Sequence, residues 1–389
     1  MRILHVIDVL TLGGGQGLAL RVLDGLQRRD TENALCVVLT ARRTHRLWHL
    51  PVTPTYLEFQ GNYRRLLSWN RCVGQLTRLI REYRPDVVHS VNWLADVTAA
   101  RACRAATVAH VAYLVDRRDW LTSPSWNPML RRYITRRAFT QGNTRCMAVS
   151  QAVADFVATH LPLETERIAV VRNSIDVPSF ALSDSAKGAR SHNSSVTMGM
   201  LSTLEEEKGH ALCLQAVEEL LHRKIPLHVL IAGDGPLRQK LEHRVTAPVF
   251  EGRVRVIGEI DDARHFYGQC DIFVVPSVRS EGLPTTILEA MASSCAVVAT
   301  DIGGAGEAIE SGRSGIIVPP ADPIALADAI QQIIQDAAFR KQIQQNAAKH
   351  VLKEFDKEKM IDRICQVLSN AIAANTRTGA KGRDLQCRQ

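Results

Sequence analysis

The sequence predicts an α/β protein of two domains, each a doubly wound parallel sheet covered by helices. Three observations support this fold class. The chain has 389 residues, more than one hydrophobic core usually holds. Short apolar runs rich in β-branched residues alternate with helical patterns along its length, which is typical of parallel sheets with helical crossovers. Between residues 183 and 195 almost nothing is apolar, which favours a hinge between two domains.

The apolar runs define the expected strands and, with them, the domain boundaries. In the first half we expect strands at 3–8, 34–40, 86–91, 108–115, 146–150 and 168–173. In the second half we expect them at 196–201, 227–232, 254–257, 272–275, 296–300 and 316–318. The predicted organisation is an N-terminal domain over 1–180, a hinge over 181–195, a C-terminal domain over 196–356, a last helix over 357–374 and a disordered polar tail over 375–389.

The composition argues against several classes of protein. No apolar run approaches the roughly 20 residues that a membrane-spanning helix needs. The stretch from Met1 to Val9 is typical of a strand and not of a cleavable leader, so we expect a cytoplasmic protein. The nine cysteines are scattered without a Cys-x-x-Cys pair, which predicts neither a disulfide framework nor a zinc site.

Positive charge is concentrated in the first half of the chain. Residues 1–178 contain 24 arginines, no lysine and 14 acidic residues, a net charge of +10, so that −2 remains for the rest of a +8 chain. No nucleic-acid-binding signature accompanies this charge, and nucleic acid is not an expected partner. In the segment 126–139, Trp126, Leu130 and Tyr133 recur at helical spacing among arginines. Peripheral contact with an anionic membrane and a helix docked within its own domain are the two interpretations.

Two carboxylates flank a predicted helix start. Glu281 and Glu289 stand eight positions apart, just after the apolar run 272–275, which is expected to be a buried strand. Pro284 is expected to be the first residue of the next helix, because proline has a helical φ and lacks an amide hydrogen that would have no partner there. Where a parallel strand leads into a helix, backbone amides and the helix dipole favour an anion. The sequence therefore predicts an anion site here.

A second glycine-rich turn follows the first predicted strand. Gly13, Gly14 and Gly15 precede a helical pattern, and the absence of side chains would let a ligand approach the backbone. A dinucleotide-binding fingerprint is disfavoured, because the glycines are contiguous and no acidic residue closes the strand at 34–40. A purely structural turn is the alternative.

Six segments resemble the GT-B glycosyltransferases, specifically the large retaining family four. They are Asn173-Ser174-Ile175-Asp176; Ile231-Ala232-Gly233-Asp234-Gly235-Pro236; Val256-Ile257-Gly258 with Asp261-Asp262; the stretch 276–315; Thr300-Asp301-Ile302-Gly303-Gly304 with Glu307; and Ser314-Gly315-Ile316-Ile317-Val318-Pro319-Pro320. The resemblance implies two Rossmann-like domains facing a central cleft, with the last helix crossing back toward the first domain. Gly14 and Gly15 would then lie under the donor diphosphate.

The resemblance also implies roles on the donor side. Lys208 occupies the position of the diphosphate lysine, and Glu281 would bind sugar hydroxyls. Glu289 would bind a ribose hydroxyl. Thr203 stands where the family usually has an arginine, so a hydroxyl replaces a charge. Further donor contacts are expected from the helix start, at Gly282, Leu283, Pro284 and Thr285.

The motifs that point to the acceptor side of the site are less specific. Family members commonly have a His-Asp pair after the fourth strand, where this chain has Val115 and Asp116. Asp116 is therefore the candidate for the sugar face of the site. His89 and Asn92 are acceptor-side candidates at the end of the third strand. His110 is either such a candidate or a hydrogen-bonded core histidine, and the core interpretation is favoured.

The resemblance implies an enzyme that transfers a sugar, with retention and without a metal ion, from a nucleotide sugar to a glycan or lipid-linked acceptor at the inner face of the plasma membrane. A UDP-sugar is favoured over a GDP-sugar, and no other cofactor is expected. Thr203 and Val115 motivate an alternative, a subunit that binds the nucleotide sugar without turnover. A sugar-nucleotide epimerase of the same fold is the third hypothesis.

Overall fold

The computed structural model describes residues 1–10, 14–39, 50, 52–59, 66–117, 126–181, 195–279 and 281–386. The chain divides into two compact units, Met1–Arg172 with Glu358–Gln389, and Asn173–Lys357. Residues 173–180, which we had expected in the N-terminal domain, group with the second unit. The predicted hinge falls almost wholly on 182–194, outside the described residues.

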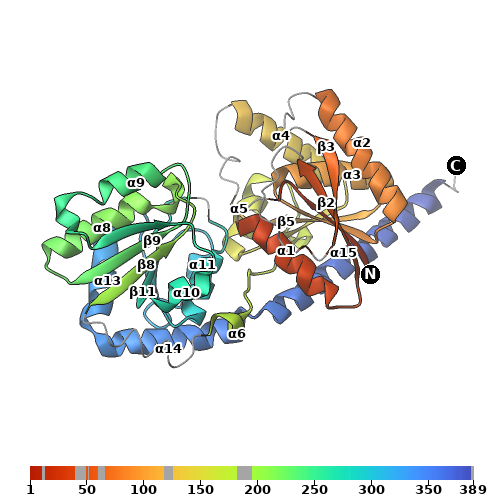
Figure 1. Ribbon diagram of the computed structural model, residues 1–389. Helices are drawn as coiled ribbons and strands as arrows, with labels where there is room; N and C mark the ends of the chain where they lie inside the picture. Colours follow the sequence, from red (N-terminus) through yellow and green to blue (C-terminus); the bar gives the residue numbers. More distant parts are fainter. Residues whose placement is uncertain are drawn as a thin grey trace. The chain divides into compact units, whose positions relative to one another are not determined.

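The first unit is built on a seven-stranded parallel sheet with the order β3-β2-β1-β4-β5-β6-β7 (Figure 1). Its strands are β1 (Arg2–Ile7), β2 (Glu32–Leu39), β3 (Pro54–Phe59), β4 (Val87–Val91), β5 (Ala109–Leu114), β6 (Thr144–Ala148) and β7 (Ile168–Val170). All residues of β4 and β5 are buried, as in a sheet covered on both faces. The strand order reverses between β1 and β4, so this sheet is doubly wound.

The helices of the first unit cover this sheet. They are α1 (Gly14–Gln27), α2 (Leu66–Tyr83), α3 (Trp93–Ala106), α4 (Trp126–Thr140), α5 (Gln151–His160), the 3₁₀ turn η2 (Thr165–Arg167) and α15 (Lys357–Gln386), which belongs to this unit from Glu358 onward. Helix α3 packs between α2 and α4. Helix α15 packs on α1, where Ile361 fills the space that a side chain on Gly25 would take.

The second unit contains a six-stranded parallel sheet with the order β10-β9-β8-β11-β12-β13. Its strands are β8 (Val196–Leu201), β9 (Leu227–Ala232), β10 (Val254–Gly258), β11 (Ile272–Val275), β12 (Ala296–Thr300) and β13 (Ile316–Val318). These strands match the expected runs to within one residue. Both sheets are parallel and doubly wound, so the predicted fold class is confirmed.

The helices of the second unit are α6 (Val177–Phe180), η3 (Glu206–Lys208), α8 (His210–His222), α9 (Arg238–Arg244), η4 (Pro248–Phe250), α10 (Ala263–Gly268), α11 (Thr285–Ala292), α12 (Ala305–Ala308), α13 (Pro323–Gln335) and α14 (Ala337–Glu354). Helices α10, α13 and α14 each begin after a capping aspartate. The Asp322 carboxylate accepts from the amides of Ile324 and Ala325, and Pro323 begins α13. Helix α8 packs beside α13, and α11 packs beside α14.

The end of the chain differs from the prediction. Helix α15 runs without interruption to Gln386, so the expected disordered tail from 375 is helical over 375–386. Extending an existing helix costs far less than starting one, which favours continuation even though this stretch contains Gly379 and Gly382. Asn375 is also tied to the first unit, because its side-chain amide donates to the Thr107 carbonyl at 3.1 Å.

Candidate functional site

The strongest candidate site lies at the carboxyl edge of the second sheet. Strands β8 and β11 are neighbours, and the chain leaves them toward β9 on one side and β12 on the other. The loops after β8 and β11 therefore diverge from a common point, which is where doubly wound sheets bind ligands. Lys208 follows β8 and Glu281 follows β11, so both predicted residues lie at this switch point.

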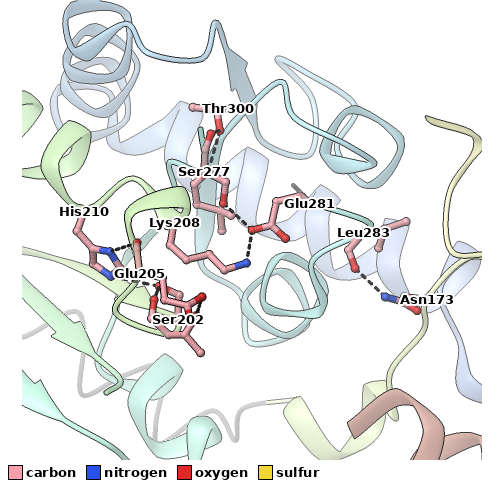
Figure 2. A network of polar contacts seen from close by, with 11 residues as sticks. Asn173, Ser202, Glu205, Lys208, His210, Ser277, Glu281, Leu283 and Thr300 are labelled. Carbon is pink, nitrogen blue, oxygen red and sulfur yellow. Dashed lines mark hydrogen bonds and ion pairs between the residues drawn. The ribbon is translucent and has the colours of Figure 1, made fainter. Parts of the chain in front are cut away.

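Lys208 and Glu281 form a direct ion pair. Lys208 Nζ lies 2.8 Å from Glu281 Oε1, and the side chains are 21% and 12% exposed. The Ser277 hydroxyl donates to the same oxygen at 2.7 Å, as Figure 2 shows. Both contacts use Oε1, which leaves Oε2 available within the described part of the structure. The pair thus places a cation and an oriented carboxylate side by side in a partly dehydrated position, where electrostatic interactions are stronger than in water.

Buried contacts beneath the pair fix the loop that carries Glu281. The Thr300 hydroxyl, at the end of β12, lies 2.5 Å from the Ser277 carbonyl oxygen (Figure 2). Gly303 has a φ of +60°, and a Cβ there would fall 2.2 Å from the Glu281 carbonyl oxygen. Only glycine allows this approach without strain. The Glu281 backbone is therefore held by β12 and the turn that follows it.

The next residues of this loop lead into α11. The buried Asn173 side chain donates to the Leu283 carbonyl at 2.8 Å (Figure 2). Pro284 caps the helix with φ −62° and ψ 120°, so the helix begins at Thr285, one residue later than predicted. Pro284 has the expected φ, but its ψ is extended, which is normal for the residue before a helix. Gly282 and Leu283 are buried, and the N-terminus of α11 lies directly after them.

Glu289 lies on the second turn of α11. Its Oε2 accepts a hydrogen bond from the Tyr267 hydroxyl of α10 at 2.9 Å. Tyr267 is fully buried, and burial, reinforced by the charge of Glu289, raises the pKa of its phenol well above the usual value. The phenol therefore stays protonated and acts as a donor to Glu289. Tyr267 belongs to none of the motifs in the sequence, so this contact was not predicted.

Thr203 lies on the exposed loop between β8 and η3. Its hydroxyl is 3.4 Å from Glu205 Oε2. This contact therefore pairs Thr203 with an acidic side chain and not with a cation. His210, at the start of α8, lies 3.2 Å from the Ser202 hydroxyl and 3.3 Å from the Glu205 carbonyl. Burial lowers the pKa of His210 to about 4, so this ring is neutral near pH 7. Because Thr203 is uncharged and His210 is neutral, Lys208 is the residue among these three that carries a positive charge.

The first unit has a matching arrangement at its own switch point. Gly14 and Gly15 form the first turn of α1. A Cβ on Gly15 would lie 2.9 Å from Asn92 Oδ1, after β4, and 3.2 Å from Val115 Cγ2, after β5. Asp116 follows Val115 and is partly buried. The structure thus brings Gly15, Asn92 and Val115 together, in line with the order of β1, β4 and β5 in the sheet.

An acidic residue that was not predicted from the sequence lies at the start of α3 in this unit. The Asp8 carboxylate, just after β1, accepts from the backbone amides of Leu94 and Ala95. These amides form the N-terminus of α3, so Asp8 already supplies the negative charge that this helix start favours. A bound anion is therefore not needed at α3.

His89 and His110 lie in the core of the first sheet, which is the interpretation favoured for His110 and not the acceptor-side position expected of His89. Both are 1% exposed, inside β4 and β5. His89 Nδ1 lies 3.0 Å from His5 Nδ1, and His110 lies 2.8 Å from the Ser90 hydroxyl and 2.9 Å from the Thr144 hydroxyl. The surrounding helices cover both faces of the sheet, so neither ring reaches the surface. Both rings belong to the core, although His89 Nε2 has no hydrogen-bond partner among the described residues, and Asn92 stays the acceptor-side candidate.

The parts of the chain that the structure describes contain neither a metal-binding cluster nor a membrane-spanning helix. No group of three or more His, Cys, Asp or Glu side chains lies close enough together to hold a metal ion there. Within the same residues, no helix combines the length and the hydropathy that crossing a bilayer requires.

Two doubly wound parallel units in one chain, each with its candidate residues at the switch point, define the GT-B architecture. The sequence comparisons agree. The family described as Glycosyltransferase Family 4 matches residues 12–178, and the family described as Glycosyl transferases group 1 matches residues 195–336. The chain belongs to this family of glycosyltransferases.

Individual relatives add detail. The lipopolysaccharide core biosynthesis mannosyltransferase LpcC of Rhizobium leguminosarum bv. viciae is 32% identical over 183 residues, which cover 46% of this chain and 52% of LpcC. The match therefore spans about half the length of that relative. The lipopolysaccharide core biosynthesis glycosyltransferase LpsE of Rhizobium meliloti (strain 1021) is 26% identical over 92% of this chain and 96% of LpsE. Anabaena HepE, solved in complex with UDP, shares the fold with a TM-score of 0.79 at 22% identity, over 95% of this chain and 100% of HepE.

Proposed function

We propose that this chain transfers a sugar from a nucleotide-sugar donor to a glycan or lipid-linked acceptor in surface polysaccharide or glycolipid synthesis. The observation that carries the proposal is the Lys208–Glu281 ion pair of 2.8 Å at the switch point of the second sheet. A leaving diphosphate needs fixed positive charge, and a reacting sugar needs a fixed acceptor for its hydroxyls. The pair supplies both from adjacent loops.

The proposed reaction uses these groups as follows. The acceptor hydroxyl oxygen bonds to the anomeric carbon as the bond from that carbon to the diphosphate oxygen breaks. The departing diphosphate takes the acceptor proton on the same face, so the anomeric configuration is retained. Lys208 and the amides at the start of α11, including that of Thr285, stabilise the growing negative charge. Glu281 holds sugar hydroxyls, and no metal ion takes part.

Other predicted residues keep subsidiary roles in this proposal. Thr203 donates a hydrogen bond to a phosphate oxygen in place of the family's usual arginine. Gly14 and Gly15 leave room for the donor, Asn92 serves the acceptor side, and Asp116 serves the sugar face. Thr203 has no positive charge that could help to stabilise the diphosphate. Replacing Lys208 should therefore lower turnover by a larger factor than the same change in relatives that have the arginine.

The donor and acceptor classes rest on relatives. HepE is described in complexes with UDP, with UDP and glucose, and with UDP-glucose, which supports a UDP-sugar over a GDP-sugar. LpcC and LpsE are described as lipopolysaccharide core enzymes, which supports a lipid-linked or surface glycan as the acceptor. We propose that the protein meets such an acceptor at the cytoplasmic face of the membrane.

A two-part experiment tests this function. A thermal-shift panel of UDP-, GDP- and ADP-sugars identifies the donor, because a ligand that binds the folded state raises the melting temperature. The binding donor is then labelled in the sugar and incubated with membrane extract, with and without EDTA. Transfer to an acceptor with the α or β configuration of the donor preserved supports the proposal. A rearranged nucleotide sugar without transfer would indicate an epimerase, and binding without any product a non-catalytic subunit.

Contact with an anionic membrane is a second part of the proposal. Leu67 on α2 is 86% exposed, and Met129 and Tyr133 on α4 are 45% and 59% exposed. Arg136 and Arg137 are exposed on the same helix as the latter two. Exposed apolar side chains with arginines beside them fit a lipid surface. These residues belong to the unit that holds the excess positive charge.

Vesicle sedimentation tests this contact. The wild type should sediment with vesicles of phosphatidylcholine and phosphatidylglycerol but not with phosphatidylcholine alone, and salt should weaken the binding. The double substitution Met129→Ser and Tyr133→Ser should reduce it. Leu352→Ser on α14, also 57% exposed, is the matched control in the second unit. Equal losses in both variants would argue against a binding face on α4.

A further inference from the structure

The hydrogen bond between Tyr267 and Glu289 joins a fully buried hydroxyl to a partly buried carboxylate. The Tyr267 hydroxyl on α10 donates to Glu289 Oε2 on α11 at 2.9 Å. The other oxygen of this carboxylate, Oε1, has no hydrogen-bond partner among the residues that the structure describes. Helix α11 begins directly after the loop that carries Glu281. One end of the Glu289 side chain is thus tied to the core, and the other oxygen is available.

The ring of Tyr267 is held on several sides, so the position of its hydroxyl is fixed. The centroid of the Phe273 ring on β11 lies 5.1 Å from the centroid of the Tyr267 ring, edge to face. The centroid of the Phe180 ring on α6 lies 6.2 Å from it. The neighbouring Phe266 ring lies 6.1 Å away. Contacts of this kind between aromatic rings favour a single arrangement of the group. The hydroxyl is therefore a rigid donor that can set the orientation of Glu289.

A glutamate on a helix surface ordinarily samples several rotamers, and fixing them on binding costs entropy. The Tyr267 hydrogen bond removes much of this cost in advance, because it selects the rotamers that bring Oε2 to the hydroxyl. An oriented carboxylate oxygen is a good acceptor for a sugar hydroxyl. A nucleoside diphosphate offers two such donors, the 2′ and 3′ hydroxyls of its ribose.

We propose that Tyr267 is a positioning residue that orients Glu289 to accept a hydrogen bond from a ribose hydroxyl of the donor nucleotide. The inference rests on the proposed function, because it assumes that a nucleoside diphosphate binds at this edge of the sheet. It adds that the preference for ribose over deoxyribose depends on a tyrosine that does not touch the ligand. Tyr267 acts only through the carboxylate.

The test compares ribonucleotides with their deoxy forms. The probe is the nucleoside diphosphate, among UDP, GDP and ADP, whose sugar derivative binds in the thermal-shift panel, with its 2′-deoxy and 3′-deoxy analogues. Dissociation constants are measured by calorimetry for the wild type and for Tyr267→Phe, which removes one oxygen atom and keeps the ring. We expect the wild type to prefer the ribonucleotide over at least one deoxy form. In Tyr267→Phe that preference should fall by about tenfold, the factor that corresponds to 1.4 kcal/mol, with little change in the affinity for the deoxy form.

Two further variants make the result specific. Glu289→Gln should lose the same preference, and adding Tyr267→Phe to it should have little further effect, since both act on one contact. Tyr83→Phe, which removes a hydroxyl at the end of α2 in the first unit, is the matched control and should leave the preference unchanged.

The outcomes separate this inference from the proposed function. If no nucleoside diphosphate binds the wild type, the proposed function fails. If one binds and Tyr267→Phe leaves the ribose preference unchanged, the inference is overturned while the function stands. If Tyr267→Phe weakens the ribonucleotide and both deoxy forms equally, Tyr267 has a structural role only, and the inference is likewise overturned.

Discussion

Gly209 packs against the carbonyl oxygen of Pro276, so closely that a Cβ built on Gly209 would fall 1.8 Å from that oxygen. Gly209 has a φ of +75° and joins η3 to α8, directly after Lys208. Pro276 directly follows β11. The Val278 amide donates to the Glu207 carbonyl at 2.8 Å and joins the same two loops. The approach of these loops sets Lys208 beside Glu281.

Substitution of Gly209 by alanine should therefore be costly. The left-handed backbone alone costs a residue with a Cβ about 1–2 kcal/mol, and the contact with Pro276 forces the two loops apart. We expect Gly209→Ala to lower the free energy of unfolding by about 3 kcal/mol or more and to abolish stabilisation by the donor. Urea unfolding followed by circular dichroism and the donor thermal shift measure the two effects.

Gly252 provides the matched control. It has a φ of +73°, but a Cβ there would meet nothing within 4 Å. Gly252→Ala should thus cost only the backbone strain, about 1–2 kcal/mol, and leave donor binding intact. Equal losses in the two alanine variants would show that the contact with Pro276 is not what makes Gly209 necessary.

The ion pair at the switch point predicts separate effects on activity and on folding. We expect Lys208→Ala and Glu281→Gln each to lower turnover by about 10² or more, the usual effect of removing one fixed electrostatic group from a site. Both variants should keep a native circular dichroism spectrum, since both side chains are partly exposed. Arg313→Ala removes an exposed ion pair with Glu310 and should leave turnover unchanged. Wild-type rates in Lys208→Ala or Glu281→Gln would remove that residue from the site.

Three buried histidines predict that the first unit loses stability in acid. Burial lowers the pKa of His5 to about 4 and of His110 to about 3, and burial with the charges of His5 and His110 lowers the pKa of His89 well below 6.5. In the unfolded chain these rings take up protons as the pH falls through 6.5, whereas in the folded chain they stay neutral until about pH 4. Stability from these rings is thus complete above pH 6.5 and is lost as the pH falls toward 4, by about 1.4 kcal/mol per pH unit for each histidine.

The positions of the tryptophans allow the stability of the first unit to be measured separately from that of the second. All five tryptophans fall within the sequence range 1–172 of the first unit: Trp48, Trp69, Trp93, Trp120 and Trp126. Urea unfolding followed by tryptophan fluorescence at pH 7.5, 6 and 5 should give a falling free energy, and His110→Gln should reduce the slope. His243→Gln, an exposed histidine of the second unit, is the control. A slope that His110→Gln does not change would contradict the assignment.

The strands of this fold were predictable because their apolar runs are continuous and separated by polar segments. The edge strand β3 was missed, since Pro54 breaks the pattern that identifies a strand. Proline is tolerated there because it is the first residue of an edge strand, where a missing amide hydrogen costs little. The helical continuation over 375–386 was missed for a related reason, because a polar composition does not show whether an existing helix continues through it.

The candidate site was predictable only where residues belong to a motif. Glu281 and Lys208 were identified in this way, and the structure brings them into contact. Ser277 and Tyr267 were not, because nothing in the sequence shows which hydroxyl reaches which carboxylate after folding. His89 was expected on the acceptor side, and His110 was weighed for that role against the favoured core position, although their strands are covered on both sides. A signal was present in the unbroken apolar runs around them, which are typical of a central strand.

Gly15 offers the last prediction, on the first unit. A Cβ there would lie 2.9 Å from Asn92 Oδ1 and 3.2 Å from Val115 Cγ2. The Asn92 side chain can turn away, and alanine favours a helix by about 1 kcal/mol over glycine, so Gly15→Ala should cost little stability. It should still lower turnover, because the methyl group displaces Asn92 and fills space assigned to the donor. Gly17→Ala lies on the same helix, and its Cβ would meet only Arg21, at 3.7 Å. Gly17→Ala should stabilise the protein and keep full turnover, and a similar turnover in both variants would remove Gly15 from the site.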